Sequence, residues 1–105
     1  MNLYRKLHFS QYRVSLVIPT YNESAAIGDV IEDFRDKVDE VIVADNQSPD
    51  GTADIARAKG ATVISKPLTG YGEALRCALQ AATGDILVLA EGDASFTADE
   101  DRKSV

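Results

Sequence analysis

The stretch VSLVIPTYNE, residues 14–23, decides how this chain folds. Its first residues are mostly apolar and β-branched, and Pro19 stops the run, which is typical of a buried strand. Polar or aromatic side chains follow the proline, from Thr20 to Glu23. The stretch therefore predicts a strand whose carboxyl end carries groups that can bind a ligand.

The segments that follow alternate between helical and strand patterns. Residues 27–34 carry apolar side chains at helical spacing, and the apolar run at 41–44 predicts a second buried strand. Ser48 and Pro49 are typical of the N-cap and first position of a short helix, which Gly60 ends. A third strand is expected directly after this helix, at residues 61–64.

The last part of the chain repeats this order. A glycine-bearing loop at 66–72 leads into a helix whose apolar face spans residues 74–82, with Gly84 expected as its C-terminal cap. Residues 86–90 then predict a fourth buried strand. This alternation predicts an α/β fold, a three-layer sandwich with a mainly parallel sheet and right-handed crossovers.

Composition narrows the class of function. The chain has 105 residues and is 45% hydrophobic, which indicates one small globular domain. Its net charge is -6. The acidic balance argues against non-specific nucleic-acid binding, which needs clustered Lys and Arg. The single cysteine, Cys77, cannot form an internal disulfide, so we expect it to be a core residue and the protein to be cytoplasmic.

Polar strand ends converge at one edge of the predicted sheet. In open parallel sheets, ligands bind outside the carboxyl ends of the strands, which here carry residues 20–23, 45–48 and 91–93. Glu91 and Asp93 can point to the same side, and Gly92 leaves room for a ligand to approach the backbone. Paired carboxylates of this kind suit Mg²⁺ or Mn²⁺ shared with substrate phosphates, although a solvated acidic turn has the same pattern.

Two common nucleotide folds do not fit the sequence. The segment GYGEALR, residues 70–76, lacks the spacing of a dinucleotide-binding loop and does not follow the first strand. The chain also has no phosphate-binding loop of the type found in ordinary nucleoside triphosphatases.

Several segments in the same order resemble family 2 glycosyltransferases of the GT-A fold. They are VSLVIPTYNE, VIVADNQSPDGTADIA and GYGEALRCALQAATGDILVLAEGD, and the similarity spans residues 14–96. Within the family, the chain is most similar to polyprenyl-phosphate sugar transferases of the dolichyl-phosphate mannosyltransferase type. The resemblance implies a Rossmann-like nucleotide-binding half, a nucleotide-diphosphate sugar donor, metal-assisted departure of the diphosphate, and a polyprenyl phosphate as one candidate acceptor.

The resemblance also implies roles for individual residues. The residues that would line the nucleotide-sugar pocket are Pro19, Tyr21, Glu23, Ala44, Asp45, Asn46 and Gly92. Those that would hold the metal are Glu91 and Asp93, and those that would shape the pocket floor are Gly70, Gly72 and Arg76. Glu91 and Asn46 each stand where the family commonly has aspartate, and no catalytic base is implied.

The resemblance further suggests how the chain is organised. We expect a lead-in at residues 1–13, a nucleotide-sugar-binding part at 14–97 and a charged tail at 98–105. Family domains are longer, so we expect this to be the N-terminal portion of an enzyme, with membrane association only through parts outside it. A catalytically incomplete nucleotide-binding or assembly module is the alternative, and a nucleotidyltransferase ranks last because residues 19–29 are acidic rather than basic. Open sheet edges would allow a homo-oligomer.

Overall fold

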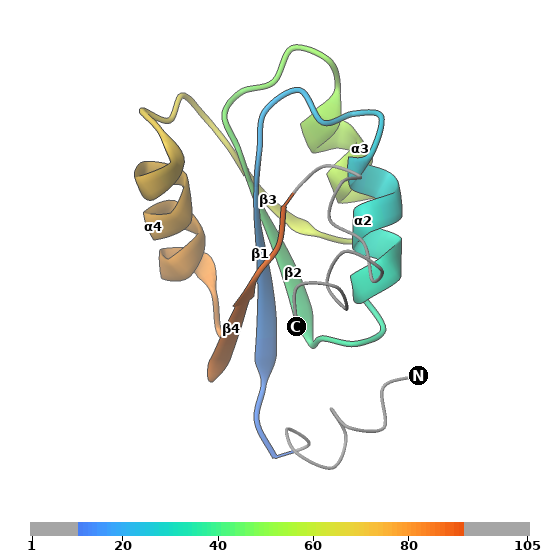
Figure 1. Cartoon of the computed structure of the whole chain (residues 1–105), viewed down its shortest axis with the longest axis vertical. Coiled ribbons are helices and arrows are strands. Elements are labelled where there is room, and N and C mark those ends of the chain that lie inside the picture. The colour runs from blue at the N-terminus through green and yellow to red at the C-terminus, as the bar shows by residue number, and fades with distance from the viewer. Residues whose placement is uncertain (1–10, 92–105) are drawn as a thin grey trace, which may run out of the picture.

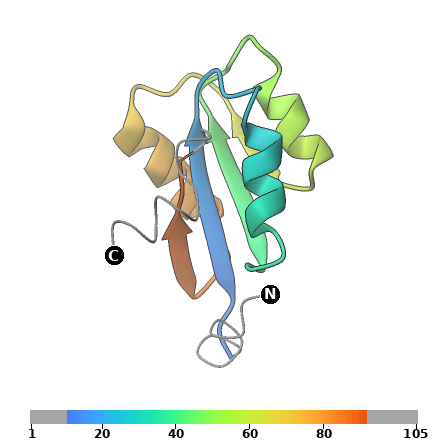
Figure 2. The same cartoon turned by 45° about the vertical axis from the view of Figure 1, so that its right-hand side comes forward.

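The computed structural model of the chain describes residues 11–91, which form an α/β fold. The elements in chain order are β1 (Val14–Thr20), α2 (Ile27–Phe34), β2 (Glu40–Asp45), α3 (Thr52–Ala58), β3 (Thr62–Ser65), α4 (Tyr71–Ala81) and β4 (Ile86–Leu89). The described strands form one parallel sheet in the order β3-β2-β1-β4. Helices α2 and α3 lie on one side of this sheet and α4 on the other (Figure 1, Figure 2), which confirms the predicted three-layer fold.

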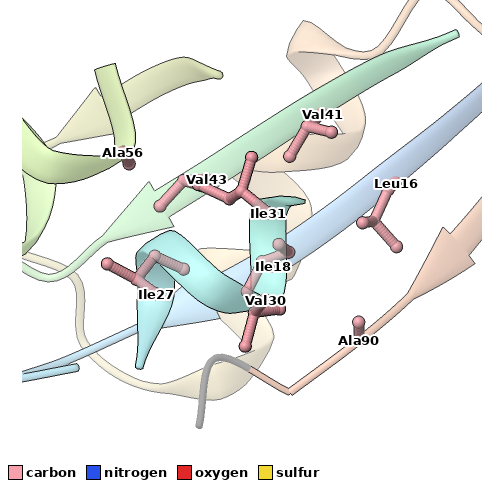
Figure 3. Close-up of a cluster of buried hydrophobic side chains, with 9 residues drawn as sticks. All are labelled: Leu16, Ile18, Ile27, Val30, Ile31, Val41, Val43, Ala56 and Ala90. Carbon is pink, nitrogen blue, oxygen red and sulfur yellow. The ribbon is translucent and has the colours of Figure 1, made fainter. Parts of the chain in front are cut away.

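The two faces of the sheet bury separate apolar clusters. Along β1, Leu16 and Ile18 pack toward α2 and α3 (Figure 3), whereas Val17 packs toward α4. Each buried side chain of this size contributes about 1.5–3 kcal/mol, so the alternation along β1 holds both helical layers in place. Cys77 is buried on the α4 side, as predicted for a core residue.

The fourth strand is not buried, and that prediction was wrong. Leu87, Val88 and Leu89 are 38–45% exposed, because β4 lies at the end of the sheet and, within residues 11–91, pairs with β1 alone. Its apolar side chains reflect β propensity and, among the described residues, leave an open, hydrophobic strand edge.

Two of the three helix boundaries predicted from single residues need correction. Ser48 does not cap α3, whose N-cap is Gly51 with φ of 89°. Gly84 does not cap α4, because Ala82 already leaves the helix in an extended conformation. Gly84 instead lets the chain approach β1, since a Cβ there would lie 2.3 Å from the Ser15 hydroxyl and 2.9 Å from the Arg13 carbonyl oxygen. Gly60, with φ of 95°, follows the end of α3 as predicted.

A carboxylate stabilises the amino ends of the strands, opposite the polar edge. Glu40 accepts hydrogen bonds from the Ser15 hydroxyl at 2.5 Å and the Thr83 amide at 2.6 Å. Partial burial acts to raise the pKa of Glu40, but these hydrogen bonds outweigh it and hold the pKa below its usual value. The helices in the described part of the chain are too short or too polar to cross a membrane.

Candidate functional site

A cavity of about 240 Å³ lies at the carboxyl ends of the strands. The loops that follow these strand ends are at the top of Figure 1. The residues that line the cavity are Pro19, Thr20, Tyr21, Asn46, Leu68, Gly70, Tyr71, Ala74 and Glu91. They come from the ends of β1, β2 and β4, from the connection between β3 and α4, and from the first residues of α4. Because β2 and β4 flank β1 on opposite sides, the cavity lies where ligands bind in open parallel sheets.

The walls of the cavity combine apolar surface with exposed rings. Leu68 and Ala74 are buried, whereas Tyr21 and Tyr71 are 54% and 52% exposed. Apolar walls with accessible aromatic rings suit a flat, heterocyclic ligand, which gains from stacking and from burial.

Gly70 shapes the connection that forms one wall. It has φ of 155° and ψ of -174°, a region of backbone space that is essentially restricted to glycine. Beside it, Glu73 accepts hydrogen bonds from the Thr69 amide at 2.5 Å and from the Thr69 hydroxyl at 3.0 Å. These two bonds lower the pKa of Glu73 and fix the turn that leads into α4.

A buried carboxylate holds the strand ends together behind the cavity wall. Asp45 is 0% exposed and accepts hydrogen bonds from the Thr20 hydroxyl at 2.7 Å, the Ser48 hydroxyl at 2.6 Å and the Ser48 amide at 2.8 Å. The Asn22 amide in turn donates to the Ser48 hydroxyl oxygen at 2.8 Å. Asp45 therefore positions the loops after β1 and β2 without presenting a surface to a ligand.

A second carboxylate joins the same two loops at the surface. Asp50 accepts hydrogen bonds from the Thr52 hydroxyl at 2.5 Å, the Thr52 amide at 3.1 Å and the Ser24 amide at 3.1 Å. The Thr52 hydroxyl is the main cause that lowers the pKa of Asp50 to about 2. These contacts hold the loop after β2 against the start of the segment that leads into α2.

The structure brings five of the predicted site residues to the cavity. They are Pro19, Tyr21, Asn46, Gly70 and Glu91. The sequence pattern did not single out Leu68, Tyr71 and Ala74 as lining residues, since apolar side chains after a strand resemble ordinary core residues. Their one sequence signal is proximity to Gly70 in the segment that carries the family resemblance.

Other predicted site residues lie elsewhere. Ala44 and Asp45 are fully buried behind the wall, so the structure does not support direct contact with a nucleotide. The Glu23 amide donates to the Thr52 hydroxyl oxygen at 3.0 Å, and Glu23 is not among the lining residues.

The remaining predicted residues separate into two groups. Gly72 lies in the first turn of α4, and Arg76 pairs with Glu73 at 3.6 Å; neither residue lines the cavity. Gly92 and Asp93 lie outside the described residues, so their predicted roles stay predictions.

The described part of the chain contains no group of three or more His, Cys, Asp or Glu side chains placed to hold a metal ion. Glu91 is nevertheless exposed at the cavity, two residues before Asp93, the second predicted ligand in the sequence. An exposed carboxylate fits the oxygen-rich coordination of Mg²⁺ or Mn²⁺, which commonly keep water and substrate phosphate ligands.

Comparison with known sequences identifies related proteins. The family model for glycosyl transferase family 2 matches residues 15–105. The chain is 37% identical over 92 residues to the protein RfbJ of Shigella flexneri, a match that covers 86% of this chain and 71% of RfbJ. It is 36% identical over 92 residues to glycosyltransferase AglJ of Haloferax volcanii, covering 86% of this chain but 30% of AglJ.

Solved structures with the same fold include two sugar-phosphoglycerate synthases. Mannosyl-3-phosphoglycerate synthase from Rubrobacter xylanophilus superposes with a TM-score of 0.79 at 27% identity, covering 92% of this chain and 35% of that one. Glucosyl-3-phosphoglycerate synthase from Mycobacterium tuberculosis, in complex with Mn²⁺, UDP and glucosyl-3-phosphoglycerate, superposes with a TM-score of 0.72 at 38% identity, covering 80% of this chain and 34% of that one. The chain thus spans about a third of the length of these solved relatives.

Proposed function

Because the chain belongs to glycosyl transferase family 2, we propose that its cavity binds the nucleotide diphosphate of a sugar donor. The observation that carries the proposal is the cavity itself, in which an amide, an exposed ring and a carboxylate from separate strand ends meet a second exposed ring from the start of α4. In this role the chain is the donor-binding part of a transferase that moves the sugar to an acceptor.

The order of the strands supports a direction for the bound nucleotide. Asn46 follows β2 and Glu91 follows β4, with β1 between them. Neighbouring strands lie about 4.8 Å apart, so the two ends of the site are separated by roughly 10 Å. We place the base near Asn46 and Leu68, the ribose across the end of β1, and the diphosphate near Glu91.

We further propose that Glu91 and Asp93 hold Mg²⁺ or Mn²⁺, with Gly92 leaving room for the diphosphate. The solved complex of the Mycobacterium tuberculosis relative with Mn²⁺ and UDP supports this assignment. When bound, such an ion stabilises the negative charge on the departing diphosphate. Glu91 contributes a carboxylate on a longer side chain than aspartate, and Tyr21 offers a ring against which the nucleoside stacks.

The acceptor and the location are proposals drawn from the sequence. We propose a polyprenyl phosphate acceptor and a cytoplasmic protein that acts at the cytoplasmic face of a membrane. The names of two solved relatives refer instead to phosphoglycerate, so a small phosphorylated acceptor is the competing choice.

A nucleotide-binding or assembly module without transfer activity is the second candidate function. It is favoured by the cavity lining, which within residues 11–91 includes one carboxylate, Glu91, and no further group placed to act as a base toward an acceptor. A turnover assay of the 105-residue chain with radiolabelled nucleotide sugars separates this candidate from the first.

Calorimetric titration of the chain with UDP, GDP and CDP, with and without Mn²⁺, tests the donor site. We expect binding that requires Mn²⁺ and that weakens at least about tenfold in Glu91→Gln, since a charge-assisted contact is lost. Glu32→Gln is the matched control, because Glu32 lies on α2, pairs with Lys59 at the surface and is not among the lining residues. A folded sample that binds none of these nucleotides would refute the proposed function.

A further inference from the structure

The Asn46 side chain has a fixed orientation. The backbone N–H of Leu68 donates to Asn46 Oδ1 at 2.8 Å. A backbone N–H can only donate, so the atom that faces it must be the amide oxygen and the other terminal atom must be Nδ2. Among residues 11–91, no acceptor is hydrogen-bonded to Nδ2, although Asn46 is half-buried and lines the cavity.

The neighbouring polar groups form no hydrogen bond with this nitrogen in the described part of the chain. The Thr20 hydroxyl, which also lines the cavity, donates its proton to Asp45 at 2.7 Å. Asp45 is fully buried and already accepts hydrogen bonds from Thr20, Ser48 and Ser65. Asn46 Nδ2 is therefore a hydrogen-bond donor without a protein partner in the described part of the chain, at the end of the cavity assigned to the base.

The residue type at position 46 decides whether the site offers a ligand a hydrogen-bond donor or an acceptor. An asparagine whose oxygen is held by Leu68 can offer a ligand a donor only. An aspartate in the same place would accept from Leu68 with one oxygen and offer the ligand an acceptor with the other. The two residues have nearly the same shape, so the exchange reverses the polarity of the site and leaves its size unchanged.

On the basis of the proposed nucleotide site, we infer that Asn46 selects the base of the donor by donating a hydrogen bond from Nδ2 to the base edge. Cytosine presents an unprotonated N3 beside its O2 carbonyl, and both atoms accept. Uracil presents an N3–H between two carbonyls. When Asn46 Nδ2 approaches N3 of uracil, two donors face each other and no hydrogen bond can form between them. A site that leaves a polar group unpaired discriminates strongly between such ligands, and Asn46 is therefore a specificity-determining residue.

The test compares CDP and UDP on the 105-residue chain and on Asn46→Asp, in the presence of Mn²⁺. The two nucleotides carry the same ribose and diphosphate, so the ratio of their dissociation constants cancels any repulsion between the new carboxylate and the phosphates. Asn22→Asp is the matched control. Asn22 is exposed at the neighbouring strand end, is not among the lining residues, and has φ of 56°, a conformation that aspartate also tolerates.

We expect Asn46→Asp to shift the ratio of affinities at least about tenfold toward UDP, and Asn22→Asp to leave it within about twofold of the original. Circular dichroism and urea unfolding establish that each variant is folded. An unchanged ratio in Asn46→Asp, or an equal change in both variants, overturns the inference and leaves the nucleotide site intact. Failure of the folded original chain to bind either nucleotide overturns the inference together with the proposed function.

Discussion

Exchange of the buried carboxylate of Asp45 for an amide is expected to destabilise the fold. Asp45 is 0% exposed and accepts from the hydroxyls of Thr20 and Ser48 and from the Ser48 amide. In Asp45→Asn, the side-chain oxygen must face the Ser48 amide, because a backbone N–H cannot reorient to accept. The new NH₂ group then faces the two hydroxyls, both of which must turn to accept from it.

The size of the effect follows from the hydrogen bonds that change. Bonds to a charged group contribute about 1.5–3 kcal/mol, and neutral bonds about 0.5–1.5 kcal/mol, so each of the three exchanges costs roughly 1–1.5 kcal/mol. Removal of a buried charge recovers part of the desolvation penalty. We therefore expect the free energy of unfolding to fall by about 2–3 kcal/mol, which in a chain of this size lowers Tm by roughly 10–20 °C.

Urea unfolding at pH 7, followed by far-ultraviolet circular dichroism, measures this loss. Asp54→Asn is the control, because the Asp54 side chain is 87% exposed and pairs with Arg57 at 3.1 Å on the surface of α3. Exposed pairs of this kind contribute about 0–1 kcal/mol, so the control is expected to lie close to the original chain. Equal stabilities of Asp45→Asn and the original chain would refute the positioning role of the carboxylate.

The other predictions concern pH, backbone strain and the open sheet edge. The Thr52 hydroxyl lowers the pKa of Asp50 from 3.8 to about 2, so its contribution to stability is complete above about pH 4 and is lost as the pH falls toward 2. Acid unfolding of Asp50→Asn should lack this component, and an unchanged profile would contradict the assignment. Gly70→Ala should lower the free energy of urea unfolding by about 1–3 kcal/mol, and a neutral result would show that the loop relaxes. Gln47→Gly should raise it by about 0.5–1 kcal/mol, because Gln47 has φ of 50°, whereas a loss would mean that its side chain stabilises the loop. Leu89→Lys should reduce self-association in sedimentation velocity if the chain pairs through β4, and unchanged association would exclude this edge.

The sequence predicted the fold where local patterns suffice and missed it where distant contacts decide. Helical and strand periodicities identified every described element and their parallel arrangement. Burial of β4 could not be predicted from residues 86–90, because burial depends on what lies beside a strand rather than on its own side chains. The cap assigned to Ser48 failed for a similar reason, since its hydroxyl and amide both bind Asp45 instead.

The candidate site shows the same division. Polar residues at strand ends led to the prediction that Asn46 and Glu91 share one edge of the sheet, and both residues line the cavity there. The apolar walls, Leu68 and Ala74, were missed because nothing in their chemistry distinguishes a pocket wall from a core. Ala44 was placed in the pocket by resemblance, but it ends up among the buried side chains that face α4.

Asp45 and Asn46 are adjacent in sequence but have different roles in the structure. Successive residues at a strand end point in different directions, so Asp45 turns inward to hold the loops and Asn46 lies at the cavity. Asp45 holds the loops on which the position of Asn46 depends, so Asp45 is a positioning residue for Asn46.

Asp45→Asn should therefore weaken the binding of CDP and of UDP to the same degree, because it loosens the site without changing which atoms face the base. Asn46→Asp should alter their ratio, because it changes those atoms and leaves the loops in place. Affinity measurements on the two single variants and on the double variant separate these effects, since independent roles make the two changes in binding free energy additive. A change of the CDP-to-UDP ratio in Asp45→Asn itself would instead show that the carboxylate acts on the base directly.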